Sequence, residues 1–247
     1  MTEYANEINK YLGLVRQEIE KLLRLKSGNL KELVDLEKAN FCNNLHPFLV
    51  LLAAKAYGSL NQQIVSLAAV IQYIYIGFSI HKEVLEEEKA HQEPKKSFQY
   101  PVLAGDYLCS CFFLSLCRSG MERFLEPLSQ VLCQINEASL WRLLNKERDF
   151  ELDLKIAEGE AGALLGEACC LGSYLTGANE AEQKHWRLFG FSLGRFLGLK
   201  KMGYTFEQLK VYWLKIKQIL KNLPAGENQR LLENLLEKIS GEESKNG

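Results

Sequence analysis

The 247-residue chain has little proline, almost no net charge and no run in which β-branched residues alternate with polar ones. Only five prolines occur, and without an alternating pattern the sequence gives no indication of a sheet. Lysine and arginine together number 30 and aspartate and glutamate 31, for a formal charge of −1. So balanced a chain has no field that attracts nucleic acid, and we expect no nucleic-acid partner.

Hydrophobic runs of membrane-spanning length are also missing. The two most apolar stretches, 67–80 and 102–117, contain Gln72 and Asp106 and fall short of the roughly 20 apolar residues that cross a bilayer. The start, Met1 to Glu7, is polar and acidic, unlike a signal peptide. Seven cysteines lie in apolar stretches without a C-x-x-C pair, which is typical of reduced thiols in a core. These features predict a soluble, cytoplasmic protein with no membrane span.

What the sequence does contain is helical periodicity from end to end. The charged segment 85–100, which includes Pro94, predicts a solvated loop or a fraying helix end. Short polar joints predict one all-α bundle over 1–240 with a disordered tail at 241–247. The expected helices cover 4–26, 30–39, 46–58, 61–84, 102–117, 122–144, 152–175, 180–200, 205–223 and 227–240.

Four stretches resemble trans-polyprenyl diphosphate synthases, in the order and spacing of that family. Val102-Leu103-Ala104-Gly105-Asp106-Tyr107-Leu108 looks like the L-A-G-D-Y-L start of a family helix. Residues 74–81, 163–172 and 189–194 are similar to the helices on either side of it in the family. The resemblance implies the isoprenoid synthase-type helical bundle, with Gly105 and Asp106 at the start of a helix.

The resemblance stops at the residues that carry the family's chemistry. Family enzymes ionise an allylic diphosphate with Mg²⁺ ions held by two D-D-x-x-D motifs, because Mg²⁺ prefers carboxylate oxygens. The first motif aligns here with Lys82-Glu83-Val84-Leu85-Glu86, where lysine and two glutamates stand in the aspartate positions. The second aligns with Lys201-Met202-Gly203-Tyr204-Thr205, which has no carboxylate. We therefore regard Lys82, Glu83 and Glu86, and Lys201, Met202 and Thr205, as degenerate motifs.

Two further family elements are altered in the same direction. The lysine-threonine pair that contacts diphosphate in the family aligns with Glu160-Ala161, and the basic G-K-x-x-R-P cluster aligns with Asn43-Asn44-Leu45-His46-Pro47. Groups that would attract Mg²⁺ or diphosphate are lost or reversed in charge. We therefore predict no catalytic residue, no metal ligand and no cofactor bound by this chain.

Such a pattern resembles the small, non-catalytic subunit (component I) of heterodimeric heptaprenyl or hexaprenyl diphosphate synthases, which serve menaquinone biosynthesis. Residues 79–84, 102–108 and 134–137 look like short elements of that subunit. The resemblance implies a regulatory subunit in a heterodimer, whose catalytic partner carries Mg²⁺ and encloses the isoprenoid chain in a tunnel. A self-dimer stays open as an alternative.

Helices 61–84, 102–117 and 122–144 supply the candidate interface or tunnel residues, although ordinary core packing also accounts for aromatic residues at this spacing. Two other functions remain open: a free-standing isoprenoid- or lipid-binding protein, and a divergent prenyltransferase that uses Glu83 and Glu86 as a metal site. The candidates are Tyr73, Tyr75, Phe78, Phe112, Phe113, Leu116, Val131 and Ile135.

Overall fold

The computed structural model describes residues 2–25, 28–29, 44–90 and 99–240, with side chains described for all of these except 24–25, 28–29, 83–90 and 99–101. This part of the chain is helical apart from one hairpin of two-residue strands, which confirms the predicted all-α class. The elements in order are α1 (Glu3–Leu23), β1 (Arg24–Leu25), β2 (Gly28–Asn29), α2 (Leu45–Lys55), α3 (Gln62–Ala90), α4 (Gln99–Arg118), η3 (Glu122–Phe124), α5 (Leu125–Leu144), α6 (Phe150–Ala157), η4 (Glu158–Gly162), α7 (Ala163–Tyr174), α8 (Glu180–Lys201), α9 (Phe206–Leu220) and α10 (Glu227–Ser240).

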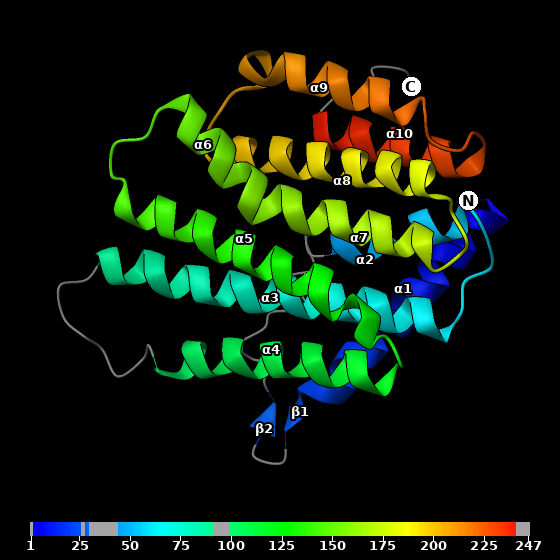
Figure 1. Cartoon of the computed structure of the whole chain (residues 1–247), viewed down its shortest axis with the longest axis horizontal. Coiled ribbons are helices and arrows are strands. Elements are labelled where there is room, and N and C mark those ends of the chain that lie inside the picture. The colour runs from blue at the N-terminus through cyan, green and yellow to red at the C-terminus, as the bar shows by residue number, and fades with distance from the viewer. Residues whose placement is uncertain (1, 26–27, 30–43, 91–98, 241–247) are drawn as a thin grey trace.

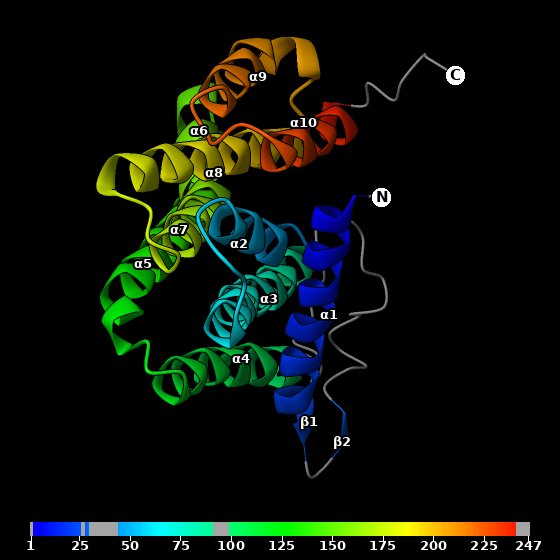
Figure 2. The ribbon, with the colours of Figure 1, turned by 90° about the vertical axis from the view of Figure 1, so that its right-hand side faces the viewer.

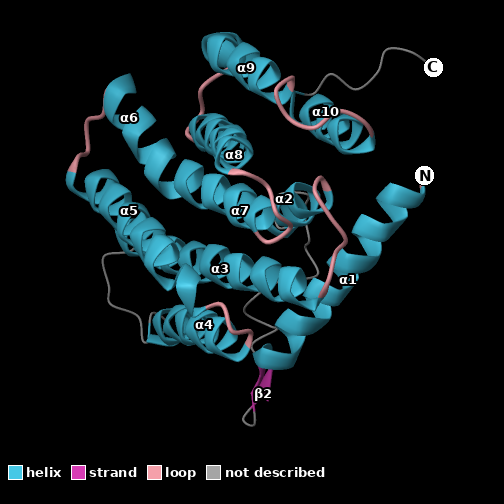
Figure 3. Ribbon diagram, turned by 45° about the vertical axis from the view of Figure 1, so that its right-hand side comes forward, coloured by secondary structure: helices cyan, strands magenta, loops and turns pink. Residues whose placement is uncertain are grey.

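Helix α3 lies at the centre of the bundle, with α1, α2, α4 and α7 packed around it (Figures 1 and 2). Helix α8 packs along α7, and α9 and α10 form an outer layer over α8 (Figure 3). By length and composition one described stretch, Gln62–Lys82, could cross a bilayer, but 72% of its apolar window is buried inside the fold. A helix that is apolar nearly all round is explained by this central position.

The predicted helices that fall on described residues are found, with ends shifted by a few residues, and the shifts in α3 and α4 bear on the predicted assignments. Helix α3 continues to Ala90, so residues 85–90 of the segment predicted as a solvated loop or a fraying helix end are helical. Helix α4 begins at Gln99, which places Gly105 and Asp106 well inside it and corrects their assignment to a helix start. The expected helix at 30–39 and the tail at 241–247 lie outside the described residues.

Gly105 allows α4 to pack closely against α3. A Cβ atom at this position would stand only 2.3 Å from Nε2 of His81, so the missing side chain lets α4 approach α3. The His81 ring also lies 3.6 Å from a carboxylate oxygen of Asp106. The Gly-Asp pair is therefore a contact point between two helices.

The expected single helix over 152–175 is interrupted by a π-helical turn, η4. Glycine at 159 and 162 allows this wider turn to lie close to its neighbours, since a Cβ at Gly159 would be 2.6 Å from the Cβ of Ala138 on α5. On the other side, a Cβ at Gly194 of α8 would be 2.3 Å from the carbonyl oxygen of Ala161. Backbone therefore meets backbone where α8 crosses η4.

This contact predicts that Gly194→Ala destabilises the fold. Because the added methyl group meets main-chain atoms that have no room to move, we expect a loss of about 1–3 kcal/mol in the free energy of unfolding. Gly13→Ala in α1 is the matched control: no atom lies within 4 Å of its added Cβ. There alanine should stabilise the helix by about 0.5–1 kcal/mol. Urea denaturation of the two variants checks this, and equal stability would contradict it.

Candidate functional site at the ends of α3, α5 and α8

The candidate site is built around one buried carboxylate, Glu160, in the π-helical turn η4. Its side chain is only 5% exposed. One of its oxygens accepts a hydrogen bond from Nζ of Lys82 on α3 at 2.9 Å. Arg142, near the end of α5, donates to both oxygens, from Nε at 2.8 Å and from Nη2 at 2.7 Å. Ser139 Oγ donates a longer bond of 3.3 Å. Three segments distant in sequence thus meet at one carboxylate.

Burial and neighbouring charge act against each other in this cluster. Burial alone would raise the pKa of Glu160, but the hydrogen bonds from Arg142 and the charge of Lys82 outweigh it and hold the pKa below its ordinary value. The pKa of Lys82 is also lowered, chiefly by burial and further by the nearby charges of Arg142 and Lys201, against the attraction of Glu160. Glu160 is therefore ionised at neutral pH and is already matched by two cations.

The first residues of the two stretches predicted to be degenerate motifs, Lys82 and Lys201, lie within electrostatic range of each other. The charge of Lys201, the last residue of α8, acts on Lys82 of α3. The rest of the second stretch forms the turn into α9: Gly203 has a φ of +101°, and Thr205 begins a capping box with Gln208. Met202 packs against the core. This stretch therefore connects two helices and offers no carboxylate to the site.

The described side chains do not fit a Mg²⁺–diphosphate centre. Such a centre needs several carboxylate oxygens free to face the ion, whereas the one carboxylate described here is occupied by Lys82 and Arg142. Among residues whose side chains are described, no three of the His, Cys, Asp and Glu type gather closely enough to hold a metal. Glu83 and Glu86 lie in α3, and their side chains are outside that set.

The stretch aligned with the family's basic cluster is also without charge where it is described. His46 is buried in the first turn of α2, and burial lowers its pKa to about 3, so the imidazole is neutral. Its ring packs against that of Tyr75, with 4.2 Å between centroids. Pro47 is buried beside it. These residues form part of the core and have no cation to attract a phosphate.

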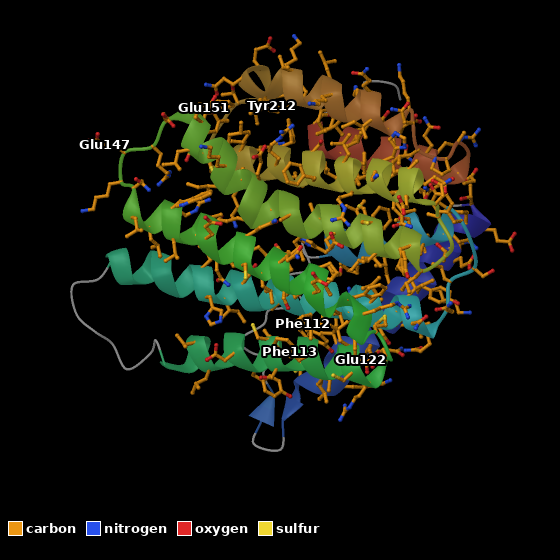
Figure 4. All side chains as sticks on the ribbon, in the orientation of Figure 1. Phe112, Phe113, Glu122, Glu147, Glu151 and Tyr212 are labelled. Atoms are coloured by element: carbon orange, nitrogen blue, oxygen red, sulfur yellow. The ribbon has the colours of Figure 1, made fainter. Side chains whose placement is uncertain are left out.

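The eight candidate interface or tunnel residues differ in exposure: one is exposed, two are partly buried and five are buried. Figure 4 shows the neighbours Phe112 and Phe113 on α4; Phe112 is fully buried and Phe113 is 45% exposed. Tyr75 and Phe78 are partly buried against the core. The remainder are buried within this chain and offer no surface to a partner: Tyr73, Leu116, Val131 and Ile135. A role in bordering a tunnel stays a prediction for the partly buried pair.

Sequence reasoning missed Arg142 as the main partner of Glu160. The signal that points to it is the glutamate itself, because an acid just before the largely apolar segment 163–172 requires a cation when it is buried. The sequence could not say which of 30 basic residues supplies it, since Arg142 lies 18 positions away and on another helix.

The fold just described is found in solved structures of prenyl synthases. A decaprenyl diphosphate synthase from Rhodobacter capsulatus superposes with a TM-score of 0.80 at 17% identity, covering 98% of this chain and 99% of that one. The geranyl diphosphate synthase small subunit from Antirrhinum majus gives a TM-score of 0.73 at 16% identity, covering 96% of this chain and all of that one. The chain thus has the isoprenoid synthase-type fold.

Sequence comparison narrows the class. The family model described as heptaprenyl diphosphate synthase (HEPPP synthase) subunit 1 matches residues 47–189, more than half of the chain, and the chain therefore belongs to this family. Octaprenyl diphosphate synthase from Escherichia coli (strain K12) is 25% identical over 158 residues, which is 61% of this chain. The chain spans about half the length of that relative, since the match covers 49% of it.

The geometry predicts that substitution of Glu160 lowers the free energy of unfolding more than substitution of Lys82 does. Glu160→Gln leaves Lys82 and Arg142 facing each other without a counter-charge, and removal of one member of a buried ion pair costs about 3–5 kcal/mol. Lys82→Met leaves the two-pronged Arg142 bond in place and removes a charge that burial already disfavours, so its loss should be less than half as large. Thermal and urea denaturation compare the two; an equal or larger loss in Lys82→Met would disprove this order.

The same carboxylate predicts an acid-dependent loss of stability. A lowered pKa in the folded chain means that the contribution of Glu160 is complete above its ordinary pKa of 4.5 and is lost as the pH falls through the lower folded value. The gap in unfolding free energy between wild type and Glu160→Gln should therefore be constant above about pH 6 and shrink below pH 4.5. Urea titrations at a series of pH values measure it, and a gap that widens in acid would contradict the assignment.

Proposed function

We propose that this chain is a non-catalytic subunit of a heteromeric long-chain prenyl diphosphate synthase. The single observation that carries the proposal is the state of Glu160: the carboxylate at the meeting point of the two degenerate motifs is satisfied by Lys82 and Arg142. The described carboxylates near these stretches, Glu160 and Asp153, are each paired with the chain's own cations. Carboxylates held in this way are not available to assemble magnesium around a leaving diphosphate. The catalytic partner holds the Mg²⁺ and performs the condensation.

Helices α4 and α5 supply the surface for this partner. They are joined through η3 and both lie on the outside of the bundle (Figure 2). Leu103 near the start of α4 is 65% exposed, and Leu140 and Leu144 near the end of α5 are 55% and 77% exposed. At the opposite ends of these helices, Phe113 and Leu125 are also exposed. Apolar side chains spread along both helices suit the core of a protein–protein interface.

Through this surface the chain completes the folded environment of its partner. The partly buried Tyr75 and Phe78 lie on α3, the helix that leads to Lys82, and are the residues we assign to the border of the product tunnel. On this proposal the complex works in the cytoplasm, and its product is the isoprenoid side chain of a quinone such as menaquinone.

Reconstitution tests the proposal. The chain alone, incubated with an allylic diphosphate, radiolabelled isopentenyl diphosphate and Mg²⁺, should give no product above background. With a subunit from the same organism that carries two D-D-x-x-D motifs, product should form, and omission of that subunit should abolish it. Mg²⁺-dependent turnover by the chain alone, lost in Glu83→Gln, would overturn the proposal in favour of a divergent prenyltransferase.

A pair of matched variants tests the surface. Leu103→Glu with Leu140→Glu places two charges in the proposed interface and should abolish both co-elution with the catalytic subunit and product formation. Leu188→Glu changes a leucine that is 44% exposed on α8, and it should leave both intact. Binding of a prenyl alcohol by the isolated chain, with no effect of the double variant on the assay, would favour a free-standing lipid-binding protein.

A further inference from the structure

Helix α9 presents two strongly exposed apolar side chains at the outer edge of the bundle. Val211 is 75% exposed and Leu214 is 57% exposed, one helical turn apart on the same face. The opposite face of α9 is fully occupied, because Trp213 and Ile216 are buried against the core. Figures 1 and 3 show α9 as part of the outermost layer, with α8 beneath it. Within the described chain no other element covers the outer face.

The same face is basic, in a chain whose formal charge is −1. Residues 206–221 contain one acid, Glu207, and four exposed lysines: Lys210, Lys215, Lys217 and Lys221. Glu207 pairs with Lys210 in the first turns, 3.1 Å apart. Another acid of this region, Glu151 at the start of α6 (Figure 4), follows Phe150, whose ring centroid lies 6.1 Å from that of Tyr212 in the middle of α9. From Val211 onward α9 therefore contains no acidic residue, and its exposed apolar side chains are accompanied by lysines and by Gln218.

We propose that the outer face of α9 docks onto an anionic lipid bilayer. Lysines near a negatively charged membrane surface each contribute a favourable interaction, and their long stems let the ammonium groups reach lipid phosphates while neighbouring apolar side chains enter the interface. Val211 and Leu214 supply the apolar contact, and Lys215 and Lys221 supply the charge, whereas the ammonium group of Lys217 lies over the Trp213 ring, 5.8 Å from its centroid. The helix lies flat on the surface and does not cross it.

A bilayer explains the combination better than a protein partner does. An acidic protein would satisfy the lysines but would not require two aliphatic side chains to stand in water at their centre. An apolar protein surface, in turn, would leave the ammonium groups to be desolvated without a partner. The inference needs only α9 and is independent of the proposed function, because α4 and α5, which carry the proposed subunit interface, lie elsewhere on the bundle.

Vesicle sedimentation of the full chain tests it. We expect binding to vesicles of phosphatidylcholine and phosphatidylglycerol at about 7:3, little binding to phosphatidylcholine alone, and weaker binding as salt rises from about 0.05 to 0.5 M. Lys215→Glu with Lys221→Glu should reduce the affinity at least about tenfold. Val211→Ser with Leu214→Ser should reduce it several-fold without changing the melting temperature, since both side chains are exposed.

Two controls accompany these variants. Lys10→Glu with Arg16→Glu makes the same change in net charge on exposed positions of α1, and Leu188→Ser removes an exposed leucine of α8; both should bind as the wild type does. Equal binding to the two kinds of vesicle, or a Lys215→Glu/Lys221→Glu variant that binds normally, would overturn the proposal. Protection of Lys215 and Lys221 from acetylation by a protein partner, with none by anionic vesicles, would overturn it in favour of an acidic protein surface.

Discussion

The arrangement of this molecule depends on the need to satisfy one buried negative charge. Glu160 stands where α3, α5 and the π-helical turn meet, and its two oxygens are held by Lys82 and Arg142. Burial of an unpaired carboxylate in a low-dielectric interior costs several kcal/mol of folding free energy. Pairing of Glu160 therefore holds these three segments together. The same pairing removes the carboxylate from any role as a metal ligand.

Two surfaces of the molecule differ in the side chains that they expose. Helices α4 and α5 expose leucines and a phenylalanine with few charges, whereas α9 exposes a valine and a leucine among lysines. The first composition suits a folded protein and the second an anionic lipid surface. A heteromeric synthase that hands a long isoprenoid to a membrane would use both, one to complete its catalytic partner and one to keep the complex near the destination of its product.

Most of the fold could be predicted from periodicity and turn residues, because long amphipathic helices with glycine or capping residues at their ends carry strong local signals. Thr205 and Asn179, for example, both begin capping boxes at the expected helix starts. What could not be predicted depends on tertiary contacts. The Gly105-Asp106 pair looks like a helix start but lies inside α4. The glycine is explained there by the contact with His81 on α3, which the sequence does not reveal. Likewise Phe112 and Phe113 are adjacent in sequence, and only packing decides that one is core and the other surface.

The π-helical turn η4 has a further consequence for how this site can change. Each residue of an α-helix advances the chain by about 100° around the axis, so loss of one residue from η4 would restore a regular helix and swing everything before it through that angle. Asp153 and its partner Arg148 both precede η4 and would turn together, away from the Tyr204 hydroxyl that donates to Asp153. Gly194 of α8 would then face a different backbone atom. The segment between α6 and α7 should accordingly accept exchanges of side chains far more readily than a change in its length.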